Sequence, residues 1–292
     1  MKIMFQTKCG IPNPLPTVNL EGPFIFHVKR GIPAVYFMVT IDPSGQNIVS
    51  VSTFEASSEL YTALCKKLER NAINDDVYNE YLSVSRGLHD ATMHVFNLLK
   101  QELYLYDHRW LTGNPLEWSL EGNDWNIIPW GSIFMYTRQR QEQELDRKSA
   151  TDLQILLNRG EEALLATEHL LEAERTKGRK FQWIEATVAA ELAIKEILVR
   201  IEPKLEAILL NLPSPPIHKL YGNIFENITG ERSEYVAVIK KGAEIRNDFI
   251  HKPKHKEINY QEVYDYIANI RKAIKHISII ERKINRTTME GT

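Results

Sequence analysis

The chain has 292 residues, of which 43% are hydrophobic and 25% are charged. These proportions are ordinary for a globular protein and exclude a collagen-like, a disordered and a disulfide-scaffold chain. Lys and Arg number 36 against 38 Asp and Glu, a formal net charge of −2, so no chain-wide positive field exists to hold a long nucleic acid. This length predicts two domains, each large enough to bury its own core.

The sequence indicates a cytoplasmic protein. Cys9 and Cys65 are far apart and fit no metal-binding spacing, which indicates reduced thiols, with one disulfide between them as the less ordinary alternative. The N-terminus turns polar too early for the apolar core of a secretion signal. No apolar stretch approaches the ~20 residues that cross a bilayer, so no membrane partner is expected.

The first half of the chain has mixed α/β character. Short runs rich in β-branched and aromatic residues predict strands of one small sheet at residues 24–28, 34–40 and 47–53. Helical periodicity follows over residues 56–70 and 76–102. Residues 103–136 return to strand-like sequence rich in tryptophan. We expect these rings to pack in the core or on the sheet, because no basic residues alternate with them as at a base-stacking platform.

A polar run at residues 139–148 marks the predicted domain boundary. We expect residues 1–147 to form an α+β N-terminal domain, whose position suits a sensor or a regulator. Residues 148–292 are expected to form an all-α helical bundle. The two parts differ in secondary structure rather than in charge.

Five or six helices are expected in the second half, at residues 149–175, 181–200, 203–212, 217–228, 233–250 and 260–284. Ser149 or Thr151 is expected to cap the first helix. The last helix carries a coiled-coil-like seam, formed by Val263, Ile267, Ile270, Ile274 and Ile277. This seam fits packing inside the bundle and a dimer interface equally well.

The segment Lys240–Lys256 stands out in a chain that lacks glycine-rich phosphate loops, paired Cys-x-x-Cys and His-Glu-x-x-His. It holds six Lys or Arg and two His against two carboxylates, a local positive patch that suits an anionic substrate such as a phosphodiester. Pro253 disfavours helical geometry at the residue before it, so a helix should end near His251. The same proline prevents His251 and His255 from sharing one metal ion, and no metal or cofactor is expected.

Arg246 and His251 supply the groups that metal-free phosphoryl chemistry requires. The histidine moves protons near neutral pH, and the guanidinium stabilises negative charge as the phosphorus becomes five-coordinate. A second pair with this spacing, Arg271 and His276, lies within the last helix, where five residues turn the side chains about 140° apart. We interpret that second pair as part of a solvated helix face.

Two stretches of the sequence resemble the HEPN domain. Arg246-Asn247 followed by His251 resembles the Arg-polar-x3-His form of its signature, and residues 189–195 resemble its early helix, which carries an acidic residue and a lysine. The resemblance covers about residues 150–285, although residues 213–231 match no general HEPN feature. It implies a helical bundle that commonly dimerises and thereby brings two Arg/His motifs into one cleft.

The resemblance also implies roles for individual residues. Arg246 would contact the scissile phosphate, His251 would act as general base or acid, and Asn247 would orient a neighbour or the substrate. Glu191 and Lys195 would support the site, or else form only an exposed helical ion pair. The candidate substrate-binding lysines are Lys241, Lys252 and Lys254.

Many HEPN proteins are metal-independent endoribonucleases of toxin–antitoxin, abortive-infection and anti-phage systems. We therefore expect a toxin or defence effector that cleaves RNA through a 2′,3′-cyclic phosphate. The expected partners are RNA, a second copy of the chain and an antitoxin or regulatory protein. The alternative is a catalytically inactive HEPN-like protein that dimerises or binds nucleotides or RNA. A third possibility assigns RNA contact to the N-terminal domain.

Overall fold

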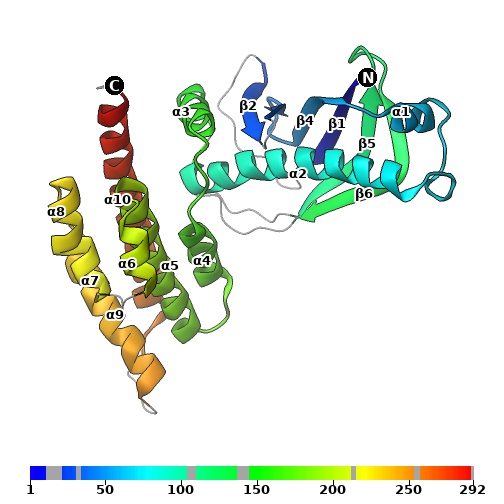
Figure 1. Cartoon of the computed structure of the whole chain (residues 1–292). Helices are drawn as coiled ribbons and strands as arrows, with labels where there is room; N and C mark the ends of the chain where they lie inside the picture. The colour runs from blue at the N-terminus through cyan, green and yellow to red at the C-terminus, as the bar shows by residue number, and fades with distance from the viewer. Residues whose placement is uncertain are drawn as a thin grey trace. The chain divides into compact units, whose positions relative to one another are not determined.

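The computed structural model describes residues 1–10, 22–30, 34–103, 110–136, 145–211, 215–252 and 257–290. The chain divides into two compact units, Met1–Ala163 and Leu164–Thr292. The first unit is a β-sheet with helices and the second is all-helical, which confirms the predicted fold class (Figure 1). Among the described residues, no helix is both long and apolar enough to cross a membrane.

The first unit is built on a six-stranded antiparallel sheet with the strand order β2-β3-β4-β1-β5-β6. The strands are β1 (Lys2–Gly10), β2 (Phe24–Arg30), β3 (Val35–Ile41), β4 (Asn47–Glu55), β5 (Trp110–Ser119) and β6 (Asn126–Tyr136). The predicted strands β2, β3 and β4 and the strand-like segment of β5 and β6 are confirmed. The sequence pattern does not predict β1, because Gln6 and Thr7 interrupt its apolar alternation. Both are nevertheless buried, since β1 pairs with β4 on one side and with β5 on the other.

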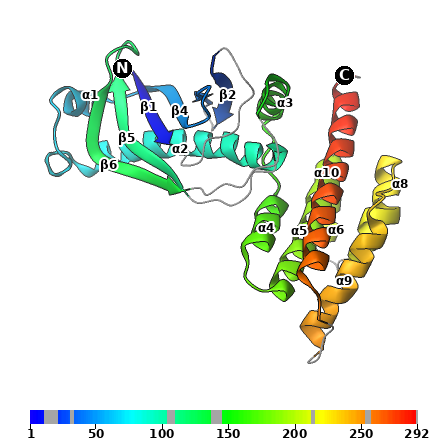
Figure 2. The ribbon, with the colours of Figure 1, turned by 180° about the vertical axis from the view of Figure 1, so that it is seen from behind.

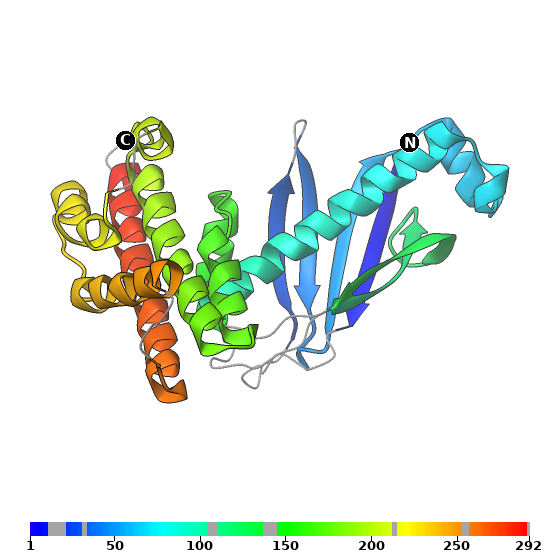
Figure 3. The same cartoon turned by 90° about the horizontal axis from the view of Figure 1, so that it is seen from below.

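A long helix covers one face of this sheet. The helices of the unit are α1 (Ser58–Cys65), η1 (Arg70–Ala72), α2 (Asp75–Leu103) and α3 (Arg147–Asn158). α2 lies across the sheet (Figure 3), and its Leu88 and Val95 are buried in one core with Phe5 and Phe26 of the strands. The prediction for α2 is confirmed. α1 is shorter than predicted, because the chain leaves the helix at Lys67, where φ is 50°.

Two tryptophans of the aromatic segment pack in the same core. Trp118 and Trp130 are buried. The ring of Trp130 meets Tyr81 edge-to-face, and its N–H donates a hydrogen bond to the carbonyl oxygen of Leu68 at 2.6 Å. The expectation of core packing is therefore confirmed for these two rings.

α3 belongs to the first unit because it covers the free edge of β2. The Gln154 side chain accepts a hydrogen bond from the backbone N–H of His27 at 2.8 Å and donates one to the carbonyl oxygen of His27 at 3.0 Å. It thereby satisfies backbone groups that an edge strand leaves open. Residues 148–163, which the sequence pattern assigns to the bundle, therefore lie with the sheet.

The prediction of one helix over residues 149–175 is wrong. α3 ends at Asn158, and the next helix begins only at Leu165. Between them Gly160 has a φ of 66°, in the left-handed region that glycine adopts without steric cost. The apolar periodicity continues across this break, so it hides the interruption.

The N-cap of α3 is Asp146 rather than Ser149 or Thr151. The Asp146 carboxylate accepts hydrogen bonds from the backbone N–H and from the hydroxyl of Ser149, both at 2.7 Å. Ser149 thus reinforces the cap from the third helical position, and the helix begins before the two residues that the sequence pattern favours.

Three side chains fasten the segment after α3 to the rest of the first unit. Nδ1 of His94, on α2, lies 2.9 Å from one carboxylate oxygen of Glu162, and Arg30, at the end of β2, lies 2.5 Å from the other. Burial and the Arg30 charge lower the pKa of His94, and the Glu162 carboxylate acts in the opposite direction. The folded unit therefore disfavours protonation of His94.

The second unit is arranged around one central helix. Its helices are α4 (Leu165–Arg175), α5 (Arg179–Ile201), α6 (Leu205–Asn211), α7 (Ile217–Lys219), η2 (Leu220–Ile224), α8 (Phe225–Thr229), α9 (Val236–His251) and α10 (Tyr260–Glu290). α4, α9 and α10 all pack on α5 (Figure 2). The predictions for α5, α6, α9 and α10 are confirmed.

The seam of α10 packs inside its own unit. Its five residues are buried in the core that also holds Trp183 and Ala190 of α5. Of the two alternatives for this seam, packing within the bundle is therefore confirmed.

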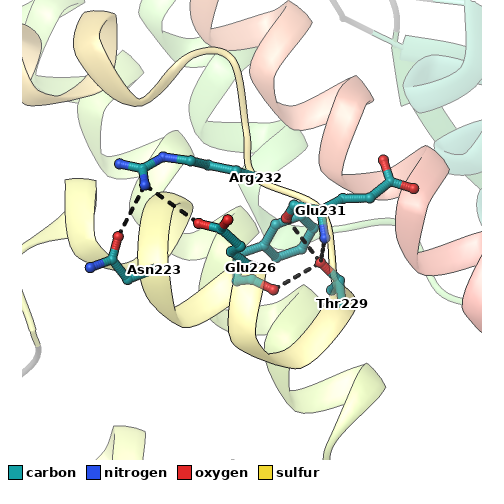
Figure 4. Close-up of polar contacts among 6 residues, drawn as sticks. Asn223, Glu226, Thr229, Glu231 and Arg232 are labelled. Carbon is teal, nitrogen blue, oxygen red and sulfur yellow. Dashed lines mark hydrogen bonds and ion pairs between the residues drawn. The ribbon is translucent and has the colours of Figure 1, made fainter.

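The predicted helix over residues 217–228 is interrupted by a π-helical turn, η2. Gly222 leaves helical geometry there, with φ −92° and ψ −112°. Figure 4 shows the polar contacts that follow, from Arg232 to Asn223 and Glu226 and from Thr229 to the backbone of Phe225 and Glu231. These contacts hold α8 against the turn that leads to α9.

Replacing Gln154 with Ala should lower the free energy of unfolding of the first unit by about 1 kcal/mol, because two hydrogen bonds to the β2 edge are lost. Hydrogen exchange of the β2 and β3 amides measures the change. Asp152→Ala, an exposed change on the same helix, is the control. Equal protection in both variants would contradict a role for Gln154 at this edge.

The first unit should lose stability as the pH falls below about 6.5, the ordinary histidine value, because the unfolded chain then binds a proton that buried His94 resists. Urea unfolding between about pH 7.5 and about pH 5.5 measures this slope. His94→Gln retains a partner for Glu162 but does not titrate, so the slope should become shallower. An unchanged slope would show that His94 contributes nothing to it.

Candidate functional site

The end of α9 is built as its sequence predicts. α9 continues to His251, and Lys252 is extended, with φ −107° and ψ 128°. Pro253 accounts for this stop, because its ring disfavours helical geometry at the preceding residue. Arg246 and His251 therefore both lie on the last turns of one helix, close to the point where α10 begins (Figures 1 and 2).

Arg246 is half-buried, and its side chain is bonded to the next residue of α9. Its guanidinium donates a hydrogen bond to the side-chain oxygen of Asn247 at 3.1 Å. Its Nε–H is buried and has no hydrogen-bond partner among the described residues. One terminal N–H of Arg246 is therefore bonded to a protein acceptor, whereas its Nε–H is not.

The backbone of α9 touches α10 one turn before Arg246. A Cβ placed on Gly242 would lie 2.1 Å from the hydroxyl oxygen of Tyr266 and 2.3 Å from its ring, so only glycine leaves room for this side chain. The Tyr266 ring stacks on Trp183 of α5, with 3.9 Å between centroids and 10° between planes. Trp183 donates its Nε1–H to the carbonyl oxygen of Gly242 at 2.9 Å, which joins three helices at one point.

The Tyr266 hydroxyl belongs to a short buried chain of hydrogen bonds. It lies 2.9 Å from Oγ1 of Thr187, and Thr187 donates its own hydroxyl proton to the carbonyl oxygen of Trp183. The phenol is therefore the donor to Thr187. Burial raises the pKa of Tyr266, and the positive charge of Arg246 acts in the opposite direction.

His251 lies on a different side of α9. Nine residues separate it from Gly242, which places it about 180° around the helix, and it is exposed. Five residues separate it from Arg246, a rotation of about 140°. A single chain therefore does not bring the guanidinium and the imidazole together, although they share the same closing turns.

The other predicted contact residues are solvated. Asn247, Lys241 and Lys252 are exposed, and Lys252 pairs with Asp248 at 2.7 Å. Lys254 lies outside the described residues. The exposed side of the α9 terminus is therefore positive, with one lysine already neutralised by a carboxylate of its own helix.

Glu191 and Lys195 form an ion pair with each other at 2.6 Å on α5, and both are partly exposed. Within the described parts of the chain, neither bonds to Arg246 or His251. The geometry therefore matches the i,i+4 pair and adds no contact to the predicted site.

The interpretation of Arg271 and His276 as a solvated face is wrong. Arg271 is only 14% exposed and pairs with Glu174 of α4. His276 packs edge-on against Tyr235, the residue that precedes α9, with 6.0 Å between ring centroids. The two side chains do point in different directions, as their spacing predicts, but each contacts a neighbouring helix.

The sequence pattern does not identify the residues that join α9 to α5 and α10: Trp183, Thr187, Gly242 and Tyr266. The signal available was Gly242 in the interior of an amphipathic helix, where glycine is unfavourable unless another group approaches closely. In the described residues, no group of three or more His, Cys, Asp or Glu is placed to hold a metal ion.

No protein-family model, no curated protein and no solved structure matches this chain. The likeness to the HEPN domain therefore depends on the residues quoted from the sequence, and the fold and the site are described from this chain alone.

Gly242→Ala should destabilise the second unit by about 1–3 kcal/mol, because the added methyl group overlaps the buried Tyr266 ring. In an unobstructed helix the same change stabilises by roughly 0.5–1 kcal/mol, so the sign is the test. Urea unfolding measures it, with Glu244→Ala on the exposed side of α9 as control. A more stable Gly242→Ala protein would contradict the close contact.

Proposed function

We propose that this protein is a metal-independent endoribonuclease that uses Arg246 and His251. One observation carries the proposal: the half-buried Arg246 donates a hydrogen bond to the Asn247 side chain, while His251 is exposed in the closing turn of the same helix. The lysines of the α9 terminus add positive charge around this turn. Such a combination suits a phosphodiester, which needs a fixed cation and a group that exchanges protons with its surroundings.

The rotation of about 140° between the two side chains adds a requirement. One copy does not present both groups to the same phosphate, so we infer that two copies place their α9 termini around one groove. Each phosphodiester then meets an arginine and a histidine that need not come from the same chain. The α10 seam is buried in its own unit and takes no part in this pairing.

The reaction needs no group beyond the two side chains and the RNA. His251 removes the proton of a ribose 2′-hydroxyl, whose oxygen attacks the adjacent phosphorus. The bond from phosphorus to the 5′-oxygen breaks, and that oxygen takes up a proton from an imidazolium. The products are a 2′,3′-cyclic phosphate and a free 5′-hydroxyl. Arg246 stabilises the extra negative charge of the five-coordinate phosphorus. DNA lacks the 2′-hydroxyl and is not a substrate.

The biological setting proposed with this activity is that of a toxin or defence effector, restrained by an antitoxin or regulatory partner. Its support is the resemblance of residues 246–251 and 189–195 to HEPN domains. In this proposal the first unit has a sensing or regulatory role, since the candidate residues all lie in the second unit.

A second candidate function is a catalytically inactive protein that binds RNA or nucleotides and dimerises through the bundle. The same 140° divergence favours it, because a binding protein needs the positive charge of the α9 terminus but not a shared cleft. The two candidates differ in one respect: binding survives the loss of the imidazole, whereas cleavage does not.

Arg246→Ala and His251→Ala should each lower the rate of RNA cleavage by about 10²–10⁴-fold, because one removes charge stabilisation and the other removes proton transfer. Cleavage of a labelled single-stranded RNA, with detection of the cyclic phosphate end and with a chelator present, measures the rate. Growth arrest on expression should disappear in both variants.

Lys272→Ala and His218→Ala are the matched controls, since both residues lie elsewhere in the second unit. Circular dichroism establishes that all four variants are folded. Equal cleavage by His251→Ala and the parent protein would refute the enzyme. Salt-sensitive RNA binding without cleavage would support the second candidate.

A further inference from the structure

The turn between α4 and α5 is basic. It holds Arg175, Lys177, Arg179 and Lys180 and no carboxylate. Within the described parts of the chain, Lys177 and Lys180 belong to no ion pair, so their charge is available to an anion from outside. The carboxylates that flank the turn in sequence each pair with another residue: Glu172 with Arg175, Glu174 with Arg271 and Glu185 with His169.

An arginine of this turn is stacked on a tyrosine at the start of α10. The Arg179 guanidinium lies over the Tyr260 ring, with its central carbon 4.9 Å from the ring centroid. It also donates a hydrogen bond to the carbonyl oxygen of Ile258 at 2.5 Å, which fixes it beside the ring. The turn and the start of α10 therefore form one surface, at the same end of the second unit as the α9 terminus (Figures 1 and 2).

Two tyrosine rings of this surface are open to solvent. Tyr260 is 75% exposed and Tyr264 is 66% exposed. Because they are four residues apart on α10, they lie on the same side of the helix, with their Cβ atoms about 5–6 Å apart. The side chains of Glu262 and Asp265 are turned by about 200° and about 140° from Tyr260. The two rings therefore face solvent away from these carboxylates.

Cations beside open aromatic rings suit a strand of unpaired nucleotides. Bases stack on exposed rings irrespective of their sequence, while Lys and Arg follow the phosphates. A guanidinium that is already fixed on a tyrosine loses little further freedom when the strand binds. An acidic peptide would use the lysines but not the two rings. The combination of both features therefore favours a nucleic acid.

We propose that Tyr260, Tyr264 and Arg179, together with Lys177 and Lys180, bind a single-stranded nucleic acid: the rings stack the bases and the cations contact the phosphates. The identity of this strand as RNA rests on the proposed function. The binding surface itself does not, because it uses none of the residues assigned to cleavage.

A labelled single-stranded RNA of about 12 nucleotides with 2′-O-methyl groups tests this surface without cleavage, because the attacking hydroxyl is absent. Fluorescence anisotropy measures its Kd. Tyr260→Leu and Tyr264→Leu should each raise this Kd about tenfold, since the stacking of one base is lost. Neither change should alter the binding of an abasic strand of the same length.

Replacing Lys177 and Lys180 together with Gln should weaken the binding of both strands. The slope of log K against log salt should become shallower by about 1.4, because two phosphate contacts are lost. If the parent protein cleaves ordinary RNA, Tyr260→Leu should raise KM about tenfold.

Tyr36→Leu is the matched control. Tyr36 of β3 is 67% exposed, and the Lys29 ammonium lies 5.8 Å from its ring centroid. It is therefore also an open tyrosine beside a cation, but it belongs to the first unit. Its replacement should leave the Kd unchanged. Circular dichroism establishes that all variants are folded.

The inference would be overturned by an unchanged Kd in both Tyr260→Leu and Tyr264→Leu, or by an equal rise of Kd in Tyr36→Leu. An abasic strand or a poly-glutamate peptide that binds the parent protein as tightly as the RNA would also overturn it. Failure of the proposed function gives a different result. In that case the parent protein cleaves no ordinary RNA, yet binding of the 2′-O-methyl strand still depends on Tyr260.

Discussion

The close approach of Tyr266 to Gly242 determines where α9 lies in the second unit. Because Gly242 has no side chain, the Tyr266 phenol packs directly on the backbone of α9. Trp183 also donates a hydrogen bond to the carbonyl oxygen of Gly242. Three helices are thereby fixed in register at one point. Arg246 follows Gly242 by one turn on the same side of α9, and its guanidinium is bonded to Asn247.

Much of the fold can be predicted because the responsible signals are local. Alternation of apolar residues predicts the strands β2, β3 and β4, and helical periodicity predicts α2, α5, α9 and α10. Pro253 predicts where α9 ends. β1 is not predictable in this way, since burial of its polar residues depends on pairing with strands distant in sequence. The break at Gly160 is missed for the opposite reason: the apolar period continues across it although the backbone does not.

Only some residues of the candidate site can likewise be predicted from the sequence. Arg246, Asn247 and His251 are found from sequence because they form a short motif in a basic segment. Trp183, Thr187 and Tyr266 are not, because they come from two other helices, 59 and 79 residues away from their partners in the chain. A large apolar residue on a helix gives no sign of which backbone it will meet. Only the unfavourable glycine within α9 marks the position of the contact.

The spacing of five residues has a physical consequence. Four residues would turn two side chains only about 40° apart, so both would face Tyr266 or both would face water. Five residues, at about 140°, leave His251 exposed while Arg246 is half-buried. Charge stabilisation is effective when the cation is oriented beforehand, and proton transfer is effective when the imidazole exchanges freely with solvent or substrate. In the proposed ribonuclease, this divergence would require the α9 termini of two chains to meet at one site.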